Sequence, residues 1–247
     1  FRDQRRSLLF DLGDLSSLPP RRLMRLSHVF VTHAHMDHFA GFDQLLRVVL
    51  GRKERLVLCG GPGFVAQVEH KLRAYTWNVV HRYEVPLVLE AREVGVDGRG
   101  ASATFSSRTG FERIAGESFA VAGDVLHDEA LFRVRGCFVD HDTPCLAYLL
   151  EEKARVGIDR ERLHALGFAT GAWLGGLKRA LLAGVPDDTP IDVAWRDADG
   201  AHATRRPLGA LRALIVAVAP GRRIGYVTDL RYTPANVDVL AGLRAGV

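Results

Sequence analysis

The stretch Thr32–His38, Thr-His-Ala-His-Met-Asp-His, constrains this chain more than any other part of its sequence. It follows an apolar run typical of a buried strand and precedes a segment with helical spacing. In an extended chain successive side chains point to opposite faces, so His33, His35 and Asp37 would share one side. Where the strand turns into the helix, Asp37 and His38 could diverge toward a second point. The pattern therefore predicts a cluster of ligands at the mouth of a strand.

This cluster has the chemistry of a metal site. Imidazole and carboxylate groups together suit zinc, and they also bind manganese or iron. Three ligands on one metal leave a position for water, and two metals about 3.5–4 Å apart could hold a bridging hydroxide and a phosphoryl oxygen. A histidine-rich surface loop without metal is the alternative. The spacing, the preceding strand and the following helix all favour a two-metal hydrolytic site.

Length and composition set wide limits. With 247 residues the chain can form one sizeable core or at most two small domains. The formal charge of +4 suits a polyanionic partner but is too small to establish one. The three cysteines form no Cys-x-x-Cys pair, so we expect reduced thiols in a cytoplasmic protein. No stretch reaches the roughly 20 apolar residues needed to span a bilayer, so we expect no membrane partner.

The rest of the chain alternates apolar strands with helical segments. Residues 91–125, with short strand-like runs and glycine-rich turns, would form a second sheet, and the polar stretch 186–207 would be a connection. Strands are predicted at 7–11, 29–31, 56–59, 131–139, 145–150 and 222–229, and helices from Pro20, over 40–50, over 63–75 and from Pro234.

Three residues outside the cluster also stand at predicted strand ends. Asp11 could orient a metal-bound histidine from behind, or it could be a turn residue before glycine. His141 precedes a proline-containing turn, a suitable place for a third histidine on the first metal, or for a structural histidine in a polar turn. Asp229 could bridge two metals with its carboxylate, or it could cap a helix or turn.

Residues 153–184 have the composition of an inserted arm. They hold six lysines and arginines against two acidic residues, with several glycines and Trp173 among them. Basic groups, glycine flexibility and an aromatic ring suit a mobile arm that contacts RNA phosphates and stacks a base. A solvated amphipathic hairpin is the alternative. The candidate RNA-binding residues are Arg160, Arg162, Lys178 and Arg179.

His33–His38, in the form His-x-His-x-Asp-His, resembles the signature of the metallo-β-lactamase superfamily. The resemblance implies an α/β fold, the αββα sandwich of two mixed sheets flanked by helices, with the metals at one edge of the sheets. From about Leu8 to Asp229, the order of the other motifs resembles the ribonuclease Z family. The collinear pieces are Leu8–Gly13, the turn Gly61–Gly63, Val139–Glu152, the arm at Leu163–Lys178, and Tyr226–Asp229.

The resemblance to ribonuclease Z implies a role for each candidate residue. Besides binding a metal, Asp37 would orient or deprotonate the attacking water. The reaction would be endonucleolytic 3′ processing of precursor tRNA by metal-activated hydroxide, in a homodimer where one subunit's arm grips RNA for the other. The implied ligands are His33, His35 and His141 for one zinc ion, Asp37 and His38 for the other, and Asp229 as the bridge.

Parts of the family pattern fall outside this sequence. In ribonuclease Z a last metal-binding histidine lies beyond the aspartate-threonine turn, whereas no histidine follows His202 here. We therefore expect a chain truncated at both ends, with a single domain over 1–247 and the arm inserted at 153–184. Two zinc ions per chain are expected where the C-terminal ligand is present. The alternatives are a metallohydrolase of small phosphodiesters or other esters, or an inactive RNA- or partner-binding relative.

Overall fold

The computed structural model describes residues 6–245, without the side chains of 154–156, 218–220 and 245. Arg155, one of the basic residues of the predicted arm, lies outside the described side chains. Each of two compact units has its own hydrophobic core. The first unit comprises the chain up to His127, Val134–Leu149 and the part from Gly225 on; the second comprises Asp128–Arg133 and Leu150–Ile224.

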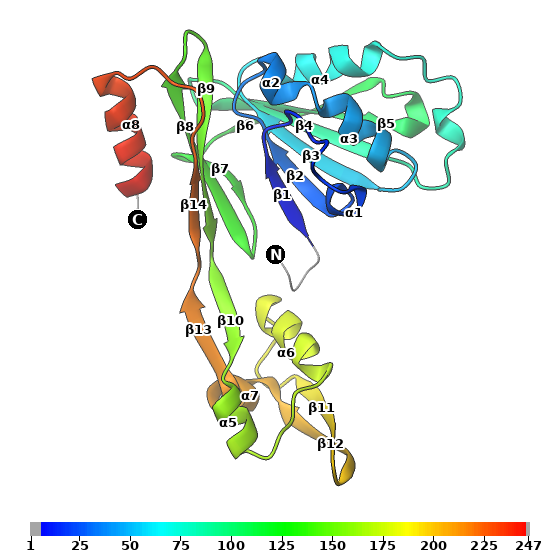
Figure 1. Ribbon diagram of the computed structural model, residues 1–247, viewed down its shortest axis with the longest axis vertical. Coiled ribbons are helices and arrows are strands. Elements are labelled where there is room, and N and C mark those ends of the chain that lie inside the picture. Colours follow the sequence, from blue (N-terminus) through cyan, green and yellow to red (C-terminus); the bar gives the residue numbers. More distant parts are fainter. Residues whose placement is uncertain (1–5, 246–247) are drawn as a thin grey trace. The chain divides into compact units, whose positions relative to one another are not determined.

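The first unit is built on a six-stranded sheet in the order β1-β2-β3-β4-β5-β6 (Figure 1). Its strands are β1 (Ser7–Phe10), β2 (Leu26–Phe30), β3 (Arg55–Gly60), β4 (Val88–Val94), β5 (Arg99–Ser106) and β6 (Arg113–Ala120). The first four run parallel, and β5 and β6 are antiparallel. The prediction that residues 91–125 form a second sheet is therefore wrong, because β4 pairs in parallel with β3 and its hairpin extends the first sheet.

Helices cover one face of this sheet (Figure 1). They are α1 (Pro20–Leu23), α2 (Met36–Phe39), α3 (Phe42–Val49) and α4 (Phe64–Arg73). In α3 the buried side chains Phe42, Leu45, Leu46 and Val49 recur at helical spacing, so one stripe of the helix joins the core of the sheet. Each such side chain contributes about 1.5–3 kcal/mol to stability when it is fully buried.

The second sheet of this unit has the strand order β14-β9-β8-β7. Tyr148 of β9 joins the two sheets: its buried hydroxyl donates a hydrogen bond to the Val31 carbonyl at 2.7 Å, and its ring centroid lies 5.6 Å from that of Phe30. The strands are β7 (Val125–Asp128), β8 (Phe132–Asp140), β9 (Pro144–Glu152) and β14 (Arg223–Tyr226).

The last helix of the first unit, α8 (Pro234–Ala245), packs on this second sheet. Its Leu243 shares a small core with Val139 of β8 and Ala147 of β9. Figure 1 shows α8 and α2–α4 on opposite sides of the paired sheets. The predicted α/β sandwich, with helices outside two sheets that face each other, is confirmed.

The second unit carries its own core. β10 (Ala154–Ile158) pairs antiparallel with β13 (Val216–Pro220). The chain between these two strands forms three helices, α5 (Arg160–Ala165), α6 (Trp173–Leu182) and α7 (Leu208–Ile215). The stretch predicted as a connection is instead a hairpin of β11 (Pro190–Asp197) and β12 (Gly200–Pro207), so that prediction is wrong. The core side chains are Leu163, Trp173, Leu177, Val193, Leu208, Leu211 and Ile215.

Neither a membrane-spanning helix nor a disulfide occurs among the described residues. None of their helices is both long and apolar enough to cross a membrane. Cys59, Cys137 and Cys145 carry free thiols, and burial raises the pKa of Cys59 to about 12.

His28 of β2 is a buried imidazole between cationic neighbours. Its Nδ1 lies 3.0 Å from a guanidinium nitrogen of Arg6, and its ring centroid lies 4.3 Å from that of His127. Burial lowers the pKa of His28 from 6.5 to about 3, and the charges of His127, Arg6, Arg92 and Arg55 act in the same direction. The folded protein therefore holds this imidazole neutral where the unfolded chain would protonate it.

Acidification is expected to destabilise the protein through His28. Between pH 6.5 and pH 3 the unfolded chain binds a proton that the folded state does not, so stability falls as the pH falls. From pH 7 to pH 4 the loss from this residue is about 3 kcal/mol. Urea unfolding at several pH values measures it, with His28→Phe as a variant that keeps a ring but cannot titrate. An equal loss of stability in the variant would rule out His28 as the source.

Candidate metal centre

Two neighbouring parallel strands deliver the predicted cluster to one edge of the first sheet. β1 ends before Asp11, and β2 is followed by Thr32–His38. The backbones of the loops that follow these strands lie so close together that a Cβ atom on Gly13 would be 2.3 Å from the Asp37 carbonyl oxygen. A Cβ atom on Gly41 would likewise lie 2.1 Å from the Gly13 carbonyl oxygen. Glycine is needed at both positions for this close approach.

The chain changes from extended to helical within the cluster. His35 precedes α2 with φ −65° and ψ 156°, so the chain turns helical at Met36, before the helix predicted from residue 40, and Asp37 lies in α2 and not in the extended run. His33 is buried, His38 is half-buried, and His35 is exposed. The turn therefore presents three imidazoles at different depths along one edge.

Two groups of side chains have the geometry of metal ligands. Three imidazoles form the first, and two imidazoles with one carboxylate form the second; within each group, one ligand atom per residue lies within 4.8 Å of the others. His33 belongs to both groups, and its Nε2 lies 2.8 Å from Nδ1 of His35. The groups are His33, His35 and His141, and His33, His38 and Asp229.

One carboxylate oxygen lies between the imidazoles. Oδ2 of Asp229 is 2.9 Å from Nε2 of His38, 3.8 Å from Nε2 of His33 and 4.0 Å from Nε2 of His141. It approaches both groups although it lies 191 residues from His38 in the chain. Imidazole nitrogens around a carboxylate fit zinc, manganese or iron, so the donor set suits the metals that the sequence predicts.

Asp37 stands apart from both groups. Its side chain is 79% exposed, and its Oδ2 lies 3.4 Å from Nε2 of His38. Asp37 therefore lies next to the second group but is not one of its three members. Its predicted roles as ligand and as catalytic carboxylate stay predictions.

Asp11 supports His38 from the side opposite Asp229. Its Oδ2 lies 2.8 Å from Nδ1 of His38, so Nε2 is left to face Asp229. The buried carboxylate of Asp11 also accepts hydrogen bonds from the Thr32 amide at 2.7 Å and from the Tyr226 hydroxyl at 3.1 Å. Such partners behind a liganding imidazole fix the ring orientation and the tautomer.

The surroundings of His33 and His38 shift their pKa values in opposite directions. Burial lowers the pKa of His33, and the neighbouring imidazoles lower it further. Burial also opposes protonation of His38, but hydrogen bonds to Asp11 and Asp229 and the charges of Asp11 and Asp37 outweigh it and raise the pKa of His38. Burial and then the charge of Asp11 raise the pKa of Tyr226 to about 12, so this hydroxyl stays protonated as a donor.

Some residues at the site carry no signal that sequence reasoning used. The sequence predicts Tyr226 in a strand and in the family-like segment Tyr226–Asp229 but gives it no role at the site, yet its hydroxyl donates to Asp11 at 3.1 Å. Sγ of the buried Cys145 lies 3.6 Å from Nδ1 of His33. The position of Tyr226 three residues before Asp229 was the one available hint.

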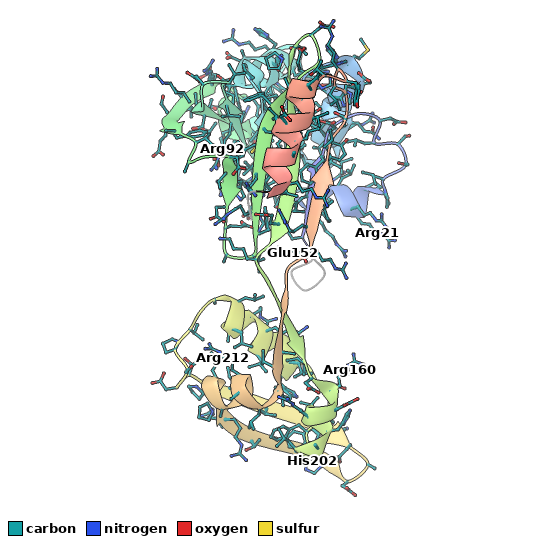
Figure 2. All side chains as sticks on the ribbon, turned by 90° about the vertical axis from the view of Figure 1, so that its left-hand side faces the viewer. Arg21, Arg92, Glu152, Arg160, His202 and Arg212 are labelled. Carbon is teal, nitrogen blue, oxygen red and sulfur yellow. The ribbon has the colours of Figure 1, made fainter. Side chains whose placement is uncertain are left out.

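The four candidate RNA-binding residues lie on two helices of the second unit. Arg160 and Arg162 belong to α5, and Lys178 and Arg179 to α6; Figure 2 labels Arg160. The two α5 arginines and Arg179 are exposed, and Lys178 is half-buried. Their contact with RNA stays a prediction. Trp173, expected as a base-stacking ring, is 7% exposed inside the core, so that expectation is wrong.

The fold and the site define a candidate metallohydrolase: a two-sheet sandwich with clustered histidines and a carboxylate at one edge. No family model matches the chain. It is 32% identical over 243 residues to ribonuclease Z of Deinococcus radiodurans, covering 97% of this chain and 68% of the relative. Ribonuclease Z of Treponema denticola is 27% identical, with 92% and 60% covered. The chain belongs to the ribonuclease Z family, and the resemblance seen in its motifs is confirmed.

Two solved structures are also similar in part. Human tRNase Z, short form, is 17% identical with a TM-score of 0.38, over 61% of this chain and 54% of that one. The metallo-β-lactamase fold protein YhfI from Bacillus subtilis is 15% identical with a TM-score of 0.33, over 60% of this chain and 47% of that one.

Proposed function

We propose that the chain is a metal-dependent phosphodiesterase that cleaves precursor tRNA endonucleolytically at its 3′ side. The observation that carries the proposal is the convergence of His33, His141 and Asp229, from three distant segments, on one edge of the sandwich. Family membership supports the same reaction, since the curated relatives are named ribonuclease Z. These relatives are longer than this chain, which spans 60–68% of their length.

The site's own residues would hold two metal ions, most simply zinc. We assign His33, His35 and His141 to one ion, Asp37 and His38 to the other, and Asp229 to both. When bound, such ions lower the pKa of water and offset charge on a phosphoryl oxygen. Manganese or iron would suit the same ligands.

The chain's carboxylates would do the positioning and the proton transfer. Asp11, held by Thr32 and Tyr226, fixes the His38 ring with Nε2 toward the reaction side. Asp37 lies in solvent beside His38, where it would orient the attacking water and accept its proton. Its 79% exposure lets that proton leave to bulk water.

The second unit and the family support a proposal for the substrate and the setting of the reaction. Exposed arginines on α5 and α6 are suited to RNA phosphates, which would be those of precursor tRNA. We propose a cytoplasmic homodimer in which the second unit of one subunit grips RNA for the other.

Chelation tests the proposal directly. Stripping the purified protein with a strong chelator is expected to abolish cleavage of a labelled precursor tRNA, and added zinc is expected to restore it. The products are resolved on a gel, and the trimmed RNA is expected to end in a 3′-hydroxyl. A small chromogenic phosphodiester is assayed in parallel. Full precursor cleavage after the metal has been removed would refute the proposal, and turnover of the small diester alone would favour a different hydrolase.

A further inference from the structure

We propose that Asn236 is a positioning residue that holds the loop of His141 against the loop of Asp229. Asn236 lies in the first turn of α8 and is 4% exposed. It is one of few buried polar residues in the described chain. The hydrogen bonds of its side chain and its amide go to Asp140, Arg231 and Thr233, none of which is a predicted ligand. The inference rests on the proposed function, because it concerns the same metal centre.

The carboxamide of Asn236 is fully engaged with two stretches of backbone. The Asp140 amide donates to its Oδ1 at 2.9 Å. Its Nδ2 donates to the Asp140 carbonyl at 3.0 Å and to the Arg231 carbonyl at 2.8 Å. Both amide hydrogens and the oxygen are used, which fixes the orientation of the group. No hydroxyl or carboxylate side chain offers the same two donors and one acceptor.

These contacts join the two loops that carry long-range ligands. Asp140 directly precedes His141, and Arg231 lies two residues after Asp229. The Arg231 amide also links the two loops directly, donating to the Asp140 carbonyl at 2.9 Å. Together the hydrogen bonds among Asn236, Arg231 and Asp140 form a clasp between the two loops. Across this clasp, Nε2 of His141 lies 4.0 Å from Oδ2 of Asp229.

The loop of His141 needs such support because its backbone is strained. Asp142 has φ of 59°, the left-handed region that disfavours non-glycine residues. A guanidinium nitrogen of Arg231 lies 2.7 Å from Oδ1 of Asp142, which adds an ion pair to the backbone links. Without Asn236, the strained loop would hold His141 less tightly relative to Asp229.

One ligand of each group depends on this clasp. His141 completes the three-imidazole group, and Asp229 completes the other. Removing a partner that hydrogen-bonds a ligand directly costs about 10–100-fold in metal affinity. Asn236 acts through the backbone beside the ligands, so we expect the low end of this range. Asn236 is therefore expected to tune the affinity of the centre for metal without touching the ion.

Asn236→Asp is the sharpest test, because it keeps the shape and places an oxygen against two carbonyl oxygens. Zinc affinity is measured without RNA, by competition with a fluorescent chelator, and is expected to fall about tenfold or more. Asn78→Asp, at the other asparagine of the chain, makes the same change at an exposed position and is expected to leave the affinity unchanged.

Thr233→Val separates positioning from simple loosening of the helix. The Thr233 hydroxyl accepts a hydrogen bond from the Asn236 amide at 3.2 Å, so its loss weakens the start of α8 and leaves the carboxamide clasp in place. The variant is expected to unfold about 2–4 °C lower with unchanged zinc affinity.

The outcomes distinguish this inference from the proposed function. Wild-type affinity in Asn236→Asp, or an equal loss in Thr233→Val, would overturn the positioning role and leave the proposed function standing. A wild-type chain that binds no zinc would overturn the proposed function itself. If Asn236→Asp does not fold, Asn236→Ser replaces it: a hydroxyl cannot make all three contacts of the carboxamide, so zinc affinity is expected to fall, and an unchanged affinity would overturn the inference.

Discussion

Replacing Asp229 by alanine is expected to lower phosphodiester cleavage by about 10³-fold. The expected loss corresponds to about 4 kcal/mol of transition-state stabilisation, within the several kcal/mol that a metal ion supplies at a phosphoryl oxygen. The measurement is kcat/KM on precursor tRNA and on a small chromogenic diester, with metal content by elemental analysis. Both activities and the metal content are expected to fall together.

The expected size of this effect comes from the place of Asp229 among the histidines. Its Oδ2 lies within 4.0 Å of Nε2 in His33, His38 and His141, so its loss would remove a carboxylate oxygen that approaches all three imidazoles. Asp229→Asn keeps the volume and removes only the charge, and it is expected to lose nearly as much.

Asp238→Ala is the matched control for this experiment. It removes an exposed aspartate from α8, nine residues further along the chain, and is expected to keep activity within about twofold. If Asp229→Ala retains its metal and its activity, Asp229 is no bridge, and the more exposed Asp37 becomes the candidate carboxylate.

The sequence predicted the part of the site that is local. His33, His35 and His38 lie within six residues, and a strand followed by a helix is enough to bring them together. His141 and Asp229 were predictable as well, because they follow strands whose ends meet at one edge of the sandwich. Tyr226 and Asn236 were not, because each is a single polar residue whose partner is set by tertiary packing.

The errors in the predicted fold have physical causes of the same kind. A strand pattern reports which residues face a core, and it cannot tell which sheet the strand joins, so the hairpin that starts at β4 was assigned to the wrong sheet. The hairpin at 190–207 did carry a signal, because Asp199 and Gly200 are typical turn residues: Ala198 and Asp199 form the loop, and Gly200, with φ of 128°, begins β12. Trp173 was expected to be exposed among glycines, but the segment builds a core that buries it.

Excising the second unit is expected to separate the two substrates of the proposed enzyme. The Glu152 amide donates to the Arg222 carbonyl at 2.8 Å, so residues 153–221 begin and end at adjacent points of the chain. An Asn-Gly turn can close that gap as a hairpin. The excision removes the core of the second unit whole, and the core clusters beside the metal centre contain none of the deleted residues.

In this excised variant, kcat/KM for precursor tRNA is expected to fall about 10²-fold, equal to about 3 kcal/mol of lost phosphate contacts. The small chromogenic diester needs no such contacts, so its turnover is expected to stay within about twofold. Precursor cleavage at the wild-type rate would refute the proposed role of the second unit. Loss of both activities would show that the excision damaged the metal centre.

A second variant keeps the unit folded and removes only its charges. If the α5 and α6 side chains contact phosphates, neutralising them is expected to lower precursor cleavage and flatten its dependence on salt, because fewer counterions are released on binding. A control with the same loss of charge on the first unit is expected to do less. Equal effects of the two variants would mean that general charge, and not the second unit, attracts the RNA. The test set is Arg160, Arg162, Lys178 and Arg179, and the control set is Arg21, Arg22, Arg25 and Arg52, each changed to glutamine.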